Sequence, residues 1–421
     1  MLRPGRSARR QTARVAALAA AVVLCVAAPG RAQTAAAPVD PDLSAEQMRR
    51  AGPFHVRPFA LLKDVGYDDN IRFDGRTRQG DSTATAGGGL EALLLAGDRG
   101  GLRLMQELDY VAFQRNTDLD HWNGHARARG ILLLRRFLVS LEDQFDSVRE
   151  RPIAEIDERL RRKNDALTAG LRTLGRGRLG LETYLRGERI DYASDNPLIA
   201  DSLRLLNRDE ATLSVLGRVR VLPKTTFILE GVVSSIRFED RAQGRDTSKR
   251  ALLPGFRLDP SASIQGDLKA GPMVFEARDR SGSDYHGLVG EGHLSTRLGR
   301  AARLKGTFDR NVAFSTLQSN LYFISTSWSA AYEQYFSRRV SGEVGYGRTL
   351  NHYPIEVAPS GADPFQGIRD DRLTDYRATV RYRANTQMTI EASAYRLSRD
   401  STDDFYDRVR NFYTFGTTYT F

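Results

Sequence analysis

The chain has very little cysteine, tryptophan and histidine. Its 421 residues include one cysteine, two tryptophans and six histidines. Cys25 lies in an N-terminal apolar run, so a chain that has lost this run has no thiol for a disulfide, a nucleophile or a metal ligand. The residue before it is Leu24, where a lipoprotein signal would have a small residue, so lipidation of Cys25 is not expected.

The chain also lacks a hydrophobic run of the ~20 residues that a membrane-spanning helix needs. The apolar run Val15–Ala28 is shorter, follows five arginines and precedes Pro29-Gly30-Arg31-Ala32. A basic stretch, a short apolar run and small residues form the layout of a secretory signal. We therefore predict a signal peptide over residues 1–32, cleaved near Ala32. The exported remainder is then either a soluble periplasmic protein or a barrel that presents every second residue to a membrane.

A strong excess of positive charge is absent from that remainder. The whole chain has a formal charge of +10, but residues 1–32 hold six arginines and no acid, so cleavage lowers the charge to +4. A basic excess that belongs mostly to a removed segment gives no support for nucleic-acid binding.

What the chain does contain is alternation. Residues 33–52 are rich in alanine, proline, aspartate and glutamine, which predicts a short flexible periplasmic tail. From residue 53 to 421, segments of about ten residues alternate between apolar and polar side chains. The last segment places aromatic residues on one face, namely Tyr413, Phe415, Tyr419 and Phe421 with Thr417 between them. The opposite face holds Phe412, Thr414, Gly416, Thr418 and Thr420, and its threonines and glycine suit a wet interior.

Alternation fits a soluble β-sandwich as well as a membrane barrel, so the connections decide between them. Tight turns such as 97–100, 222–224 and 298–300 alternate with long polar connections such as 149–164 and 354–371. That alternation is typical of barrels with short periplasmic turns and long outer loops. We predict an all-β fold, a transmembrane antiparallel barrel of about 18 strands, with 16 as the alternative, in one domain over residues 53–421.

Three stretches carry a resemblance to a known family: Gly66–Asn70, the hairpin Gly255–Gly266 and the closing Gly416–Phe421. On these stretches the chain resembles the outer-membrane β-barrel porins often encoded beside bacterial exopolysaccharide genes. The resemblance implies a porin or an outer-membrane conduit for polysaccharide. It supplies no catalytic residues.

The charged residues expected to face the interior are the strongest chemical signal. The pore-lining candidates are Glu182, Arg186, Arg218, Arg220, Arg377, Arg381, Arg383 and Glu391. Opposed acidic and basic residues set up a field that selects solutes. The structural reading has equal weight, because a charge on the lipid face costs ~2–4 kcal/mol at the midplane and must point inward in any barrel.

Other chemistry is weakly indicated. His121 and His125 could bind zinc on a helix, but on a strand they lie ~13 Å apart. Asp68, Asp69 and Asp74 do not match a calcium-loop pattern, so a role in capping turns is expected. No serine or histidine lies in a nucleophile motif, so we expect no catalytic residue, no metal site and no cofactor.

These features predict passive passage of a hydrophilic solute or polymer across the outer membrane, with exopolysaccharide as a candidate cargo. A structural or adhesin-like barrel with a plugged lumen is the alternative, and a barrel enzyme is third. The expected partners are outer-membrane lipid and lipopolysaccharide, the outer-membrane assembly machinery and periplasmic polysaccharide-export components. Phe415, Tyr419 and Phe421 are the predicted membrane-insertion signal.

Overall fold

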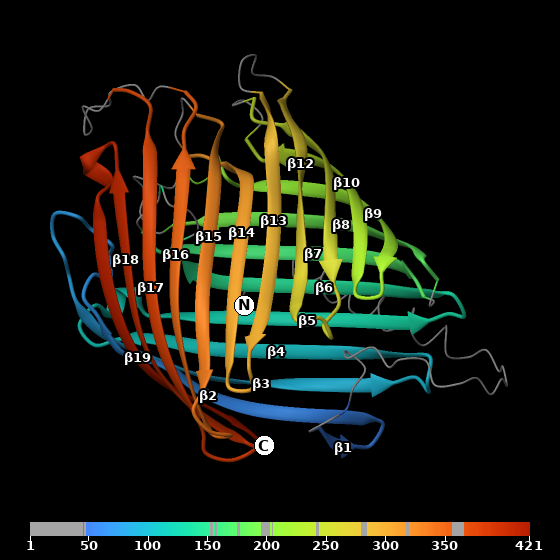
Figure 1. Ribbon diagram of the computed structural model, residues 1–421. Helices are drawn as coiled ribbons and strands as arrows, with labels where there is room; N and C mark the ends of the chain where they lie inside the picture. Colours follow the sequence, from blue (N-terminus) through green and yellow to red (C-terminus); the bar gives the residue numbers. More distant parts are fainter. Residues whose placement is uncertain are drawn as a thin grey trace, which may run out of the picture.

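Long antiparallel strands run up and down and close into a barrel. The computed structural model describes residues 45, 48–151, 155, 158–174, 177–194, 203, 205–240, 244–278, 284–316, 320–355 and 366–421. Within them, eighteen strands pair each with the next along the chain, and the last, β19, pairs with the first of the eighteen, β2. Figure 1 shows this succession from the blue β2 to the red β19. The predicted count of eighteen is therefore confirmed, and the alternative of sixteen is wrong.

The eighteen barrel strands, β2 to β19, have 12 to 15 residues each, as a barrel that spans one membrane thickness requires, whereas β1 has three. Their bounds are β1 Arg49–Ala51, β2 Phe54–Asp68, β3 Asp81–Leu95, β4 Gly100–Phe113, β5 His121–Leu133, β6 Phe137–Glu150, β7 Leu160–Thr173, β8 Leu179–Ala193, β9 Arg208–Leu222, β10 Thr225–Phe238, β11 Thr247–Leu258, β12 Ile264–Ala277, β13 Tyr285–Leu298, β14 Ala302–Phe314, β15 Tyr322–Tyr335, β16 Val340–His352, β17 Asp370–Arg383, β18 Met388–Ser401 and β19 Arg408–Thr420.

The connections divide into two kinds at the two ends of the barrel. The shortest, between β9 and β10, consists of Pro223 and Lys224, whereas the one between β16 and β17 spans residues 353–369. Short and long connections alternate around the whole barrel, as the sequence predicts. We call the short-turn end the inner end, because it faces the periplasm in outer-membrane barrels, and the long-loop end the outer end.

Each strand presents apolar residues outward and polar residues inward. On β17, Tyr376, Val380 and Tyr382 are exposed on the outer surface, while Thr379 on the opposite face is buried. The aromatic rings of Trp328, Tyr346 and Tyr376 lie next to one another on neighbouring strands, with centroids 5.2 Å apart in each pair. Such a row of rings is what the interface between membrane and water favours.

The barrel closes between β19 and β2 with one irregularity. The register shifts between Phe415 and Thr417, where β2 contains Asp64 with a φ of 55°. A bulge of this kind bends a strand and increases its twist, which helps a sheet to close on itself. Beyond the last paired residue, the Phe421 N–H donates to the carbonyl oxygen of Pro58 at 3.0 Å.

Part of the segment expected to be a flexible tail is ordered. Residues Arg49–Ala51 form the short strand β1, which pairs with the start of β2 through a turn that contains Gly52 at a φ of 62°. Ala45 and Met48 pack against the buried side chains of Leu93, Ile131 and Leu138. The predicted signal peptide, residues 1–32, lies outside the described residues. In the part of the chain that the structure describes, no helix is both long and apolar enough to span a membrane.

Candidate functional site

The inward-facing surface of the barrel, which we call the lumen, carries charges on most strands. The same alternation that sends leucine and tyrosine to the lipid sends arginine, lysine and carboxylates inward, and many of them form ion pairs. Lys63 lies 2.9 Å from Asp109, and Lys269 lies 2.8 Å from Glu291. These pairs satisfy charges that would be costly on the lipid side.

Glu182 lies at the centre of one inward cluster. Its carboxylate oxygen lies 3.5 Å from Arg218 and 3.4 Å from Arg257, which come from β9 and β11. One carboxylate shared by two arginines leaves this cluster with a net positive charge. Arg186, further along β8, instead pairs with Glu188 at 3.0 Å on the same strand.

A second cluster joins β14 to β18. Lys305 lies 3.0 Å from Glu333 and 2.7 Å from Glu343, and Arg381 lies 2.7 Å from Glu391. Here two cations meet three carboxylates, so the positive charge of Arg381 is compensated. Glu333 is not among the sequence-predicted candidates, although the period-two rule that identifies Glu391 also places Glu333 on the inward face.

The eight pore-lining candidates therefore lie on inward faces but are not equivalent. Glu182, Arg186, Arg218, Arg381 and Glu391 belong to the ion pairs just described. Arg377 stacks over the ring of Tyr395 at 5.6 Å. Within the described residues, Arg220 and Arg383 have no ion pair, and both lie near the inner end of their strands. Their role in conduction stays a prediction.

A cavity of about 660 Å³ opens in the lumen at the inner end. We call it the inner vestibule. Its eight charged or titratable lining residues come from β9 to β14 and the turns between them: Arg218, Arg220, Lys224, Arg257, Asp259, Asp267, His293 and Lys305. Five cations and one histidine face two carboxylates in this set. One of these carboxylates, Asp259 in the turn after β11, accepts a hydrogen bond from the Ser261 backbone N–H at 2.8 Å, which lowers the pKa of Asp259.

The outer end is crowded by contrast, because several long connections fold over it. Glu155, between β6 and β7, accepts hydrogen bonds from the Ser315 hydroxyl and from the backbone and side chain of Thr316, between β14 and β15. These connections are separated by eight strands along the sheet, β7 to β14, so the contact reaches across the barrel mouth. Nothing in the sequence pattern predicts this contact, because a polar loop residue has many potential partners.

Arginines anchor both ends of the connection that carries Glu155. Arg151 donates to the backbone carbonyl of Ile71. Arg159 lies 3.8 Å from Asp68 and stacks on the Phe113 ring at 5.3 Å. Burial, together with the nearby Arg410, lowers the pKa of Arg159 to about 10.

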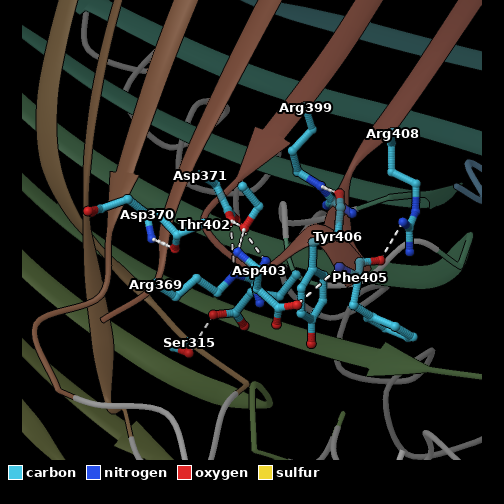
Figure 2. A network of polar contacts seen from close by, with 12 residues as sticks. Ser315, Arg369, Asp370, Asp371, Arg399, Thr402, Asp403, Phe405, Tyr406 and Arg408 are labelled. Carbon is cyan, nitrogen blue, oxygen red and sulfur yellow. Dashed lines mark hydrogen bonds and ion pairs between the residues drawn. The ribbon is translucent and has the colours of Figure 1, made fainter. Parts of the chain in front are cut away.

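Figure 2 shows a polar network at the outer ends of β17 to β19. Arg369 donates to both carboxylate oxygens of Asp371 at 2.9 and 2.7 Å, and the Ser401 hydroxyl donates to the same carboxylate at 2.6 Å. Arg369 also stacks on the rings of Tyr406, at 3.5 Å, and Tyr353. Burial acts against the charged guanidinium, but the hydrogen bonds to Asp371 outweigh it, so the pKa of Arg369 lies above its ordinary value.

An apolar cluster fills the outer part of the lumen between β9 and β15. The rings of Phe275, Phe314 and Tyr322 pack with centroids 5.1 to 5.9 Å apart, and Leu206 and Leu321 reach them from two outer connections. Beyond Arg310, β14 no longer pairs with β13. The end of β14 can therefore turn Phe314 toward this cluster.

The histidines and loop aspartates have local partners. The His121 ring lies 2.7 Å from the Leu119 carbonyl oxygen, and the His125 ring lies 2.7 Å from Asp146. Asp74 accepts hydrogen bonds from the backbone N–H groups of Arg76 and Thr77, which lower its pKa and fit a turn-capping role. Among the described residues, no group of three or more potential metal ligands comes together.

Comparison with known proteins identifies the family. No curated protein sequence matches the chain. Solved structures with a similar fold include the outer membrane protein OpdK from Pseudomonas aeruginosa, at 12% identity over 87% of this chain and 98% of OpdK with a TM-score of 0.45. OccAB3 from Acinetobacter baumannii is another, at 9% identity over 87% of this chain and 99% of OccAB3 with a TM-score of 0.49. Residues 47–418 match the family described as "Putative beta-barrel porin 2", so this closed barrel is an outer-membrane protein that belongs to that porin family.

Proposed function

We propose that the protein provides passive passage for a hydrophilic solute or polymer across the outer membrane. The observation that carries this proposal is the lumen itself, whose charged inward face continues around the barrel from Lys63 on β2 to Glu391 on β18. A polar interior bounded by an apolar outer surface is the arrangement that aqueous passage requires. The family assignment supports the same class of function.

Ion selectivity tests whether the lumen conducts. The Arg377→Gln, Arg381→Gln and Arg383→Gln triple variant removes three inward cations and leaves Glu391 without its partner, so the preference for anions should fall. The reversal potential of refolded protein in a planar bilayer under a salt gradient measures this preference. The matched control neutralises three outward-facing arginines of the same region, Arg348, Arg372 and Arg396.

A shifted reversal potential in the lumen variant with an unchanged one in the control would support passage along this face. An identical reversal potential in both would show that these arginines do not line a conducting path. Wild-type protein that conducts no ions at all would overturn passive passage.

We extend the proposal to cargo and partners. Exopolysaccharide is a candidate polymer, received from periplasmic export components, and the chain reaches the membrane after removal of residues 1–32 and handover of β19 to the outer-membrane assembly machinery. Lipopolysaccharide would then surround the outer half of the barrel. A deletion strain that secretes normal amounts of polysaccharide would eliminate the export role while leaving general porin activity intact.

A second candidate function is a scaffold barrel whose lumen is plugged and whose outer connections do the work. The crowded outer end favours it, because Glu155, Arg369 and the apolar cluster around Phe275 fill that end. The two functions differ in one measurement, since a plugged scaffold gives no steady single-channel current. An enzymatic role is not proposed, because the family is one of porins.

A further inference from the structure

Charge is distributed unequally between the two ends of the barrel. The eight inner turns between strands contain nine basic and two acidic residues, whereas the nine outer connections contain twelve basic and nineteen acidic residues. Short turns need polar residues but do not need one sign of charge. The inner end therefore presents a positive field to the periplasm and the outer end a negative one.

The inner vestibule lies at the positive end. Its cations Arg220, Lys224 and Lys305 come from three separate segments and converge on a cavity of about 660 Å³. Lys224 donates to the backbone carbonyl of Ser261 at 2.9 Å and makes no ion pair within the described residues. The nearest carboxylate that its charge acts on is Asp259, which it shares with Arg220. The cavity is large enough for a monosaccharide-sized anion with its hydration water.

Carboxylates become scarce toward the inner rim. Deeper in the lumen, Arg218 and Arg257 share Glu182. Arg220 lies two residues nearer the rim on the same face of β9 and has no ion pair within the described residues. The five cations that line the vestibule therefore outnumber its two carboxylates, Asp259 and Asp267.

Two arginines beside the vestibule oppose each other directly. Arg297 of β13 and Arg303 of β14 are register partners on the inward face. Like charges in directly opposed positions of a sheet are destabilising. The Nε atom of Arg303 is also buried without a hydrogen-bond partner among the described residues. On its other side Arg303 opposes Glu333 of β15, which offsets part of its charge. An anion between the two arginines would relieve the repulsion that remains and satisfy the buried donor.

We infer that the inner vestibule is a binding site for solutes that bear carboxylate or phosphate groups, which it captures from the periplasmic side. Guanidinium groups bind such oxyanions in a bidentate manner, and several adjacent cations allow a bound anion to pass from one to the next. This inference rests on the proposed function, because it names the chemical class of solute that the lumen admits.

Equilibrium binding tests the site without requiring conduction. Full-length protein in detergent is titrated by calorimetry with inorganic phosphate, with galacturonate and with neutral galactose at low salt. We expect both anions to bind and galactose not to bind. Binding of phosphate alone, or of galacturonate alone, would restrict the inferred class of ligand to phosphates or to carboxylates.

The discriminating variant is Arg220→Gln with Arg297→Gln, which removes one vestibule charge and one exposed charge beside the vestibule and should weaken anion binding about tenfold or more. Its matched control is Arg348→Gln with Arg396→Gln, which removes the same charge from the outward faces of β16 and β18 and should leave binding unchanged. Equal binding in both variants, or no anion binding by the wild-type protein, would overturn the inference.

Bilayer recordings separate this inference from the proposed function. Galacturonate added on the inner side should block the current at a lower concentration than galacturonate added on the outer side. The orientation is fixed by a thiol-specific block at Asp98→Cys in protein that begins at residue 33 and therefore has no other cysteine. If the barrel conducts but binds no anion, the proposal of passive passage stands and the anion site is overturned. If the barrel binds anions but conducts no ions, the anion site stands and the proposal of passive passage is overturned.

Discussion

At the scale of single residues, the outer end depends on buried charges that are fully paired. Arg369 is 1% exposed and Asp371 is 0% exposed, and two hydrogen bonds join them. A buried ion pair of this geometry contributes little net stability over an apolar pair, but the loss of one partner leaves an uncompensated charge. The network in Figure 2 is therefore sensitive to single substitutions.

We predict that Asp371→Asn lowers the free energy of unfolding by about 3–5 kcal/mol, because it leaves the Arg369 guanidinium buried without a counter-charge. Urea unfolding in lipid vesicles measures the change. The control is Asp400→Asn, which breaks the exposed Arg372–Asp400 pair at 3.3 Å and should cost no more than about 0.5 kcal/mol. Equal losses in the two variants would contradict the special status of the buried pair.

The sequence predicts which face of its strand each charged residue occupies, but it does not predict the ion pairs. Parity along one strand suffices to place Arg218 or Arg381 on the inward face. The carboxylate that each arginine meets depends on the register between paired strands and, in some cases, on side chains that reach past a strand. Glu182 and Arg257, for example, are 75 residues apart. For this reason the sequence could not distinguish the compensated Arg381 from the unpaired Arg220.

At the scale of elements, strands and turns were predictable because their signals are local. The hydrophobic alternation fixes a strand's face, and Gly, Pro and Asp mark the turns between strands. The bulge at Asp64 and the inward course of the connection around Glu155 were not predictable, because each depends on contacts with distant segments. Strand β1 was missed because three residues are too few to show a period.

The closing strand provides a prediction at this scale. Deletion of Phe421 removes both the hydrogen bond to Pro58 and a ring 4.8 Å from Tyr419, so the amount of protein in the outer membrane should fall several-fold. Fractionation and heat-modifiable migration on gels measure the inserted protein. Phe421→Tyr keeps an aromatic end and should insert normally. Unchanged insertion of the deletion variant would show that β19 needs no terminal aromatic residue.

The connections between strands provide another prediction at this scale. An epitope tag after Gly244, in the connection between β10 and β11, should be labelled on intact cells, whereas a tag after Asp98, between β3 and β4, should be labelled only after the cells are opened. A tag after Gly361, outside the described residues, should behave like the one after Gly244. Surface labelling at Asp98 without labelling at Gly244 would reverse the orientation of the barrel.

At the scale of the whole molecule, the two ends of the barrel differ in both charge and packing. The inner end is positive and holds the inner vestibule, which is lined by β9 to β14. Elsewhere in the barrel, Ala45 and Met48 pack against the buried apolar cluster that contains Leu93. The outer end is negative and filled by connections that meet across the mouth. A solute that enters at the inner end must therefore pass the outer contacts to cross the membrane. The outer end is where resistance to passage should be greatest.

This arrangement makes the contacts of Glu155 the best place to alter conductance. Its carboxylate accepts every hydrogen bond that joins it to Ser315 and Thr316, so Glu155→Ala removes all of them while Arg151 and Arg159 still anchor the ends of the connection. We expect the single-channel conductance of this variant to rise at least twofold in planar bilayers.

Asp118→Asn is the control, since it removes the same charge from an exposed ion pair with Arg72 in a neighbouring part of the outer end. If Glu155→Ala conducts no more than Asp118→Asn, the outer connections do not limit the path, and the resistance must lie in the charged clusters around Glu182 and Glu343. If neither variant nor the wild-type protein conducts, the filled outer end closes the barrel, and the scaffold function accounts for the structure.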